Sequence, residues 1–221
     1  MDLFPLINSL RVALTATAVT FFAGIAAAHY VSGAGRLVRS ALDAVLTLPL
    51  VLPPTVIGFF LLKLLGPNAA VGAFIERAFG FRLVMRWYSA IFASVIVAFP
   101  LMYRTARGAF QSFDADLKYA GQTLGLSNTY IFWRVTLPCC RQGIIAGTIL
   151  SFARALGEYG ATSMLSGYTP GKTATISTTV YQLWRTGDDA RAYAWALVNI
   201  AISCVVLVAL NFFERGRARR A

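Results

Sequence analysis

Charged residues are scarce in this chain, and acidic residues are the scarcest of them. Of its 221 residues only 13% are charged, with 9 Asp and Glu against 20 Lys and Arg. A soluble domain has about a quarter of its residues charged, so this composition excludes an ordinary water-soluble globule. The single histidine and the three cysteines show no metal-ligand spacing, so neither a metal centre nor a redox-active thiol pair is expected.

Catalytic groups are equally few. A membrane-embedded enzyme requires paired carboxylates, a metal cluster or a nucleophile with its base, and Glu158 is the single acid deep within an apolar segment. The chain also lacks a glycine-rich loop of the GxxxxGK[ST] type, the pattern that cradles nucleotide phosphates. We therefore expect neither an enzyme nor a subunit that binds ATP or another cofactor itself.

Apolar residues, by contrast, make up 57% of the chain. A helix needs roughly 20 mostly apolar residues to cross the hydrocarbon of a bilayer. Five windows approach this requirement: residues 12–31, 45–65, 87–103, 142–164 and 193–213. The sequence predicts an all-α polytopic membrane protein with five or six transmembrane helices, in a single domain that spans residues 1–221.

The net charge of +11 does not indicate nucleic-acid binding, because the basic residues gather mostly between the apolar windows and at the C-terminus. Cytoplasmic loops of membrane proteins carry an excess of Lys and Arg. The bias here is modest and favours an N-terminus outside and a cytoplasmic C-terminus, which holds Arg215, Arg217, Arg219 and Arg220. The first apolar window is long enough to remain as a span, so no removable signal peptide is expected.

The longest cytoplasmic segment, residues 105–141, has a helical pattern of its own. It predicts two short helices that meet near Gly125, the second of them capped by Ser127 and stopped at Pro138. The first helix is expected to present Phe110, Phe113, Leu117 and Ala120, and the second Ile131, Phe132 and Val135. These apolar faces need a partner, which from the residues alone is either the membrane surface or a groove in another protein.

Two further polar segments are expected outside. Residues 66–86 predict a short helix at the membrane interface, with Val71, Phe74, Ile75, Ala78 and Phe79 at helical spacing. Residues 166–191 open with a turn-rich stretch from Ser166 to Gly171.

The cytoplasmic segment resembles the EAA loop of permease subunits in ABC importers. In that family a short helix of small residues contains a glycine and is followed, ten residues after the glycine, by an aliphatic residue and then x-Leu-Pro. The resemblance implies a coupling segment, residues 105–141, that docks on an ATP-binding partner; the matching residues are Tyr119, Ala120, Gly121, Gly125, Val135, Leu137 and Pro138. The family's acidic residue is absent, because Tyr119 occupies its place after Lys118.

Within that superfamily the chain is similar to molybdate permeases. The similarity lies in residues 48–58 (LPLVLPPTVIG), 98–104 (AFPLMYR), 152–162 (FARALGEYGAT) and 170–173 (PGKT). It implies a homodimer in the bacterial cytoplasmic (inner) membrane, with two copies of an ABC ATPase that use the ATP and a periplasmic oxyanion-binding protein. Sulfate and tungstate permeases are the alternatives, and an ATP-independent anion channel is the alternative from another class.

Candidate pathway or gate residues lie at irregular points of the predicted spans. Pro49, Pro53 and Pro54 should break or kink the second span, and broken backbone must avoid lipid. The break therefore predicts a pathway lining, with a packing kink as the alternative. Arg154 and Glu158 lie four residues apart and are expected to pair, either as a structural contact or as an ion pair that is exchanged during transport.

Hydroxyl groups that suit a passing oxyanion are those of Thr55, Ser151, Thr162 and Ser163, although such groups in membrane helices often bond their own backbone. No tight basic site for an oxyanion is evident, as expected of a conduit that must release its cargo. His29 is expected at the membrane interface rather than as a ligand.

Overall fold

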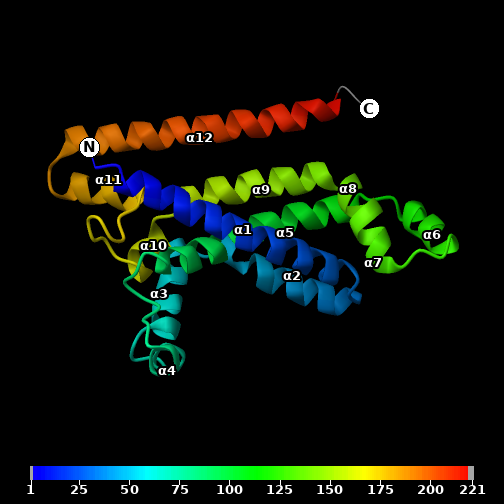
Figure 1. The fold of residues 1–221 in the computed structure, drawn as a ribbon, viewed down its shortest axis with the longest axis horizontal. Coiled ribbons are helices and arrows are strands. Elements are labelled where there is room, and N and C mark those ends of the chain that lie inside the picture. Colours follow the sequence, from blue (N-terminus) through cyan, green and yellow to red (C-terminus); the bar gives the residue numbers. More distant parts are fainter. Residues whose placement is uncertain (1, 219–221) are drawn as a thin grey trace.

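The computed structural model describes residues 2–218, and every regular element within that range is a helix (Figure 1). This confirms the all-α prediction. The long helices are α1 (Phe4–Ser32), α2 (Arg36–Val51), α5 (Ser89–Gln111), α9 (Arg141–Leu156) and α12 (Asp189–Ala218). The shorter ones are α3 (Pro54–Leu65), α4 (Ala70–Phe79), α6 (Ala115–Thr123), α7 (Asn128–Ile131), the π-helix η1 (Phe132–Thr136), α8 (Leu137–Cys139), α10 (Gly160–Leu165) and α11 (Ile176–Arg185).

Helices α1, α5 and α9 lie side by side at the centre of the molecule (Figure 1). Met102 of α5 is fully buried between the other two. A Cβ added to Gly24 of α1 would lie 2.7 Å from its Cγ, and one added to Gly147 of α9 would lie 3.0 Å from its Sδ. Glycines therefore let three helices close around one methionine, the kind of close approach by which membrane helices associate.

The second predicted span, residues 45–65, is not one continuous helix. Helix α2 begins at Arg36, continues through Pro49 and ends at Val51, and Pro54 then starts α3 at 109° to α2. Proline is well tolerated in a first helical turn, because its missing N–H has no partner there. The predicted break is confirmed, while the predicted start at residue 45 is wrong because the helical pattern extends back to Arg36.

The fourth predicted span, residues 142–164, is also interrupted. Helix α9 ends at Leu156 and α10 begins at Gly160, so this apolar window holds parts of two helices. Among the described residues, three helices are long and apolar enough to cross a bilayer: α1, α5 and the Asp189–Ala209 part of α12. The count rises to five if each of two bent pairs, α2 with α3 and Asn128–Cys139 with α9, is one span. The predicted number equals this upper count.

The two ends of the bundle differ. The N-terminus and α11 lie at one end, and α6 and α7 lie at the other, toward which α12 runs (Figure 1). Helix α4 occupies the segment for which a short helix was predicted, with Phe74 and Phe79 exposed, whereas α11 was not predicted. Arg219 and Arg220, which were expected in the cytoplasm, lie outside the described residues.

Candidate functional site

The coupling segment turns at a glycine that the backbone requires. The amide of Leu126 donates to the carbonyl of Gly121 at 3.1 Å, and the amide of Gly125 donates to that of Gln122 at 2.9 Å. These two bonds make a Schellman motif, in which Gly125 has a φ of +77°. Only glycine adopts this left-handed conformation at little cost. The sequence match at Gly125 thus corresponds to a defined helix end.

A second glycine sets the contact between α6 and α7. Ile131 of α7 is only 1% exposed, and a Cβ added to Gly121 of α6 would lie 3.0 Å from its Cδ1. Gln122 Nε2 also donates to Asn128 Oδ1 at 2.8 Å, which joins the two helices across the turn. The two helices therefore form one compact unit.

Two predicted boundaries in this unit are wrong. Phe110 was expected on the first short helix, but α5 runs on to Gln111 and carries it. Pro138 was expected to stop the second helix, but α7 continues through η1 into α8, which ends at Cys139. The wider π turn directly before Pro138 relieves the clash of its ring with the preceding carbonyls. The predicted cap is confirmed, because Ser127 Oγ accepts a hydrogen bond from the amide of Tyr130.

Apolar side chains of the coupling segment face outward. The exposed fractions are 78% for Leu124, 61% for Tyr119 and 59% for Trp133. Of the seven predicted docking residues, Tyr119, Ala120, Gly125 and Pro138 are exposed, Val135 and Leu137 are half-buried, and Gly121 is buried. The coupling segment thus has an exposed surface that includes large apolar side chains.

The base of the coupling segment packs into the helix bundle. Phe132 and Leu137 contact the buried cluster that includes Ile25 of α1, Tyr103 of α5 and Ile144 of α9. His29 of α1, which was expected to be interfacial, places its ring centroid 4.3 Å from that of Phe132. Movement of the coupling segment would therefore be transmitted to all three central helices.

The two irregular motifs of the sequence meet where α3 contacts α10. A Cβ added to Gly160 would lie 2.9 Å from Pro54 Cβ, and one added to Gly58 would lie 2.8 Å from Ala161 Cα. Pro53, Pro54 and Thr55 at the start of α3 thus adjoin the start of α10. The structure brings these parts of the two predicted pathway motifs together. Pro49 is not part of this contact, because it lies within the preceding helix, α2.

The predicted pair of Arg154 and Glu158 is confirmed. Arg154 Nη1 lies 2.7 Å from Glu158 Oε2, and Glu158 is 3% exposed. The other carboxylate oxygen, Oε1, accepts a hydrogen bond from the amide of Ala161 at 2.7 Å. Glu158 therefore holds the last turn of α9 and the first turn of α10 at once. Its negative charge near the start of α10 and the positive charge of Arg154 near the end of α9 both suit the helix dipoles.

The candidate hydroxyl groups have different surroundings. Ser163 Oγ donates to the carbonyl of Gly160 at 3.0 Å, and Ser151 Oγ is 3.5 Å from the carbonyl of Ala98. Thr162 is 1% exposed, and its hydroxyl has no hydrogen-bond partner among the described residues. Thr55 is exposed. Thr55 and Thr162, next to the junction of α3 and α10, thus remain the two candidate groups without a side-chain hydrogen bond to the described backbone.

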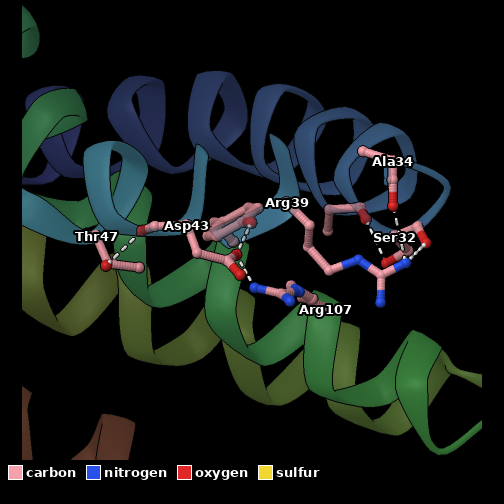
Figure 2. Close-up of polar contacts among 8 residues, drawn as sticks. Ser32, Ala34, Arg39, Asp43, Thr47 and Arg107 are labelled. Atoms are coloured by element: carbon pink, nitrogen blue, oxygen red, sulfur yellow. Dashed lines mark hydrogen bonds and ion pairs between the residues drawn. The ribbon is translucent and has the colours of Figure 1, made fainter. Parts of the chain in front are cut away.

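A polar cluster joining α2 to α5 was missed by the sequence analysis. Asp43 pairs with Arg107, and the hydroxyl of Tyr103 donates to the same carboxylate (Figure 2). Arg39 Nη2 donates to the carbonyls of Ser32 at 2.8 Å and Ala34 at 3.0 Å. No residue of α2 is fully buried, so this cluster is a principal attachment of α2 to the bundle. The sequence feature that could have indicated this cluster is Asp43, an isolated acid beside the apolar window 45–65.

A family comparison identifies the chain as a transport component of the inner membrane. Residues 20–219 match the family described as binding-protein-dependent transport system inner membrane component. The chain belongs to this family.

Individual relatives of the chain include molybdenum and sulfate permeases. The chain is 38% identical over 184 residues to the molybdenum transport system permease protein ModB of Escherichia coli K12, covering 83% of this chain and 80% of the relative. It is 34% identical over 207 residues to ModB of Mycobacterium tuberculosis, covering 93% and 77%. It is also 31% identical over 198 residues to the sulfate transport system permease protein CysW of Synechococcus elongatus, covering 90% and 69%.

Solved structures share the fold. The MetNI methionine ABC transporter matches with a TM-score of 0.73 at 14% identity, covering 96% of this chain and 94% of the other. A bacterial alginate ABC transporter, solved in complex with its pentasaccharide-bound periplasmic protein, matches with a TM-score of 0.72 at 20% identity, covering 100% and 84%. At these identities the likeness concerns the arrangement of helices.

Proposed function

We propose that the chain is the membrane-spanning subunit of an ATP-driven importer of molybdate. The observation that carries this proposal is the 38% identity to a molybdenum permease over most of both chains, in a chain whose coupling segment presents an outward apolar surface. The subunit acts as a homodimer, because five helices are few to enclose a pathway. Two copies of an ABC ATPase hydrolyse the ATP, and a periplasmic binding protein delivers the anion.

In this proposal the coupling segment is the part that the ATPase moves. Leu124, Tyr119 and Trp133 fill a groove on the ATPase, and the contacts of Phe132 and Leu137 carry the motion into α1, α5 and α9. Since α6 and α7 lie at the end opposite the N-terminus (Figure 1), the N-terminus is periplasmic and the end of α12 cytoplasmic. This orientation agrees with the modest bias of basic residues.

The junction of α3 and α10 is the proposed gate. In this proposal the break between α2 and α3 lies at membrane depth, where irregular backbone is tolerated only against protein or a water-lined cavity. Thr55 supplies an exposed hydroxyl group beside it, and Thr162 a buried one without a hydrogen-bond partner among the described residues. The pair of Arg154 and Glu158 fixes the position of α10, and so of the gate.

Sulfate is the second candidate cargo, because the chain is also similar to a sulfate permease. Tungstate has the shape and charge of molybdate and is tested beside it. Because the binding protein selects the anion, the experiment must include that protein.

The experiment reconstitutes the chain in liposomes with its cognate ATPase and binding protein. ATP hydrolysis and anion uptake are compared for molybdate, tungstate and sulfate. We expect stimulation by the molybdate-loaded binding protein that disappears when this chain is omitted. Stimulation by sulfate alone would assign the chain to sulfate import. Uptake that continues without ATP would replace the importer by an anion channel.

A further inference from the structure

A basic pocket lies at the end of the bundle opposite the coupling segment. Its volume is about 330 Å³, and its lining comes from three segments that are far apart in the sequence. Arg11 comes from α1, Arg86 from the stretch before α5, and Lys172 from the loop before α11. Of the ten described residues that line the pocket, none is acidic.

The loop that carries Lys172 is fastened to α1. The buried Asn8 donates through Nδ2 to the carbonyls of Thr173 at 3.3 Å and Ala174 at 2.9 Å. On the next residue of α1, Ser9 Oγ accepts a hydrogen bond from the amide of Ile176 at 2.8 Å. The loop is therefore positioned before any ligand arrives. It contains the PGKT sequence, to which the proposed transport cycle gives no role.

The stretch that carries Arg86 is held in an unusual conformation. Met85 has a φ of +58°, which non-glycine residues rarely adopt and which persists only where the surroundings impose it. Its amide donates to the carbonyl of Leu165 at 2.8 Å, and the amide of Arg86 donates to Ser89 Oγ at 3.1 Å. Backbone strain of this kind gathers at functional sites.

The third cation is held by an aromatic ring. The guanidinium carbon of Arg11 lies 3.5 Å from the centroid of the Trp87 ring. Stacking of this kind engages the face of the guanidinium and leaves its N–H edge available for an acceptor. Three positive charges thus converge in one pocket whose described lining provides no counter-charge, and such a cleft concentrates anions.

We propose that this pocket binds a tetrahedral oxyanion, either free or as the phosphate of an anionic lipid headgroup. Arginine provides paired N–H donors for such oxygens, and lysine adds a point charge. The volume exceeds that of one water, about 30 Å³, by roughly tenfold, so it holds an oxyanion with part of its hydration or a headgroup. The binding needs neither the ATPase nor the binding protein, so it is separate from the proposed transport function.

The first arm of the test measures free anions. The full chain, without partners, is placed in nanodiscs of zwitterionic phosphatidylcholine and titrated calorimetrically with sodium molybdate and sodium phosphate at low ionic strength. Loss of one charge-assisted contact should weaken binding about tenfold in Arg86→Gln and in Lys172→Gln. The matched control is Arg82→Gln, because Arg82 is also in an outer loop but is paired with Glu76 at 2.7 Å and does not line the pocket.

The second arm measures lipid. The chain is purified from membranes that contain phosphatidylglycerol, and native mass spectrometry counts the lipids retained. The lipid headgroup is the ligand if the unmodified chain and Arg82→Gln retain phosphatidylglycerol while Arg86→Gln and Lys172→Gln lose it. Molybdate or phosphate binding with the same variant pattern assigns a free oxyanion. The proposal is overturned if neither anion nor lipid binds, or if Arg82→Gln weakens binding as much as Arg86→Gln does.

Discussion

Two carboxylates inside the bundle organise their surroundings, and each does so by serving two partners. Glu158 accepts a hydrogen bond from the start of α10 while it pairs with Arg154 at the end of α9. Asp43 binds both Arg107 and Tyr103, and so attaches α2 to α5. At the scale of single residues, then, each of these two acids fixes the junction of two helices.

Replacing Glu158 separates its two roles. Glu158→Gln keeps an acceptor oxygen for the amide of Ala161 and loses the ion pair, whereas Glu158→Ala loses both. We expect Glu158→Ala to lower the thermal unfolding temperature in detergent more than Glu158→Gln does. The unsatisfied buried amide should cost an additional free energy of unfolding of about 1–3 kcal/mol. Equal unfolding temperatures for the two variants would show that the cap contributes nothing.

Replacing Asp43 leaves Arg107 without its acidic partner, while the positive charge of Arg39 remains nearby. Because the pair is only partly buried, we expect Asp43→Asn to destabilise the chain by about 1–2 kcal/mol and to reduce uptake. The double variant Asp43→Asn/Arg107→Gln should recover part of both losses, since it removes the unpaired charge as well. Strictly additive effects in this double-mutant cycle would contradict an interaction between the two residues.

At the scale of elements, glycines determine which helices come close. The α3–α10 contact depends on Gly58 and Gly160, and the α6–α7 contact depends on Gly121. Nearby glycines have no such neighbour: a Cβ on Gly157 would lie 3.6 Å from a carbonyl of its own helix, and one on Gly125 would meet nothing within 4 Å. Glycines with and without a neighbouring helix thus provide matched pairs for experiment.

Gly160→Ala tests the α3–α10 junction. Its new Cβ would lie 2.9 Å from Pro54 Cβ and 3.1 Å from the amide nitrogen of Thr55, so α3 must move. We expect a loss of stability of about 1–3 kcal/mol by overpacking, together with reduced uptake in the reconstituted transporter. Gly157→Ala is the control, expected to change both by much less.

Gly125→Asp tests docking of the coupling segment. Both Asp and Asn are among the residues that best tolerate a positive φ, so Gly125→Asn is a control of the same shape without the charge. We expect Gly125→Asp to abolish uptake while the chain still inserts in the membrane, because it places a charge on the apolar docking surface. Gly125→Asn should retain most uptake. Equal uptake by the two variants would argue against docking through this surface.

At the scale of the whole molecule, helix positions follow from the sequence better than helix contacts do. The apolar windows located the long helices, and Pro53 and Pro54 located the break between α2 and α3, whereas α2 continues through Pro49. Glu158 allowed its pairing with Arg154 to be predicted, but not the break between α9 and α10 beside it. The carboxylate caps α10 through an irregular backbone turn, and such a turn has no periodic pattern in the sequence. Arg11, Arg86 and Lys172 come together only through tertiary packing, which local sequence patterns do not predict.

Orientation in the membrane is testable with the native cysteines. Cys139 is exposed at the end of α8, whereas Cys140 beside it is buried. With the coupling segment cytoplasmic, a membrane-impermeant maleimide should label Cys139 in inside-out vesicles and leave it unlabelled in intact spheroplasts. Cys139→Ser should remove the signal, because Cys204 lies in the apolar α12, out of reach of the reagent. Labelling of Cys139 in spheroplasts would reverse the proposed orientation.

The outward apolar surface of the coupling segment also has a consequence for biogenesis. In the proposed orientation a newly inserted chain would expose Leu124 and Trp133 to the cytoplasm until the proposed ATPase partner covers them. Exposed apolar groups of this size are what chaperones and quality-control proteases bind. An excess of unassembled chains would thus be degraded faster than the complete transporter. The surface proposed to transmit motion in the assembled complex would then also make the cellular amount of the chain depend on the supply of its partner.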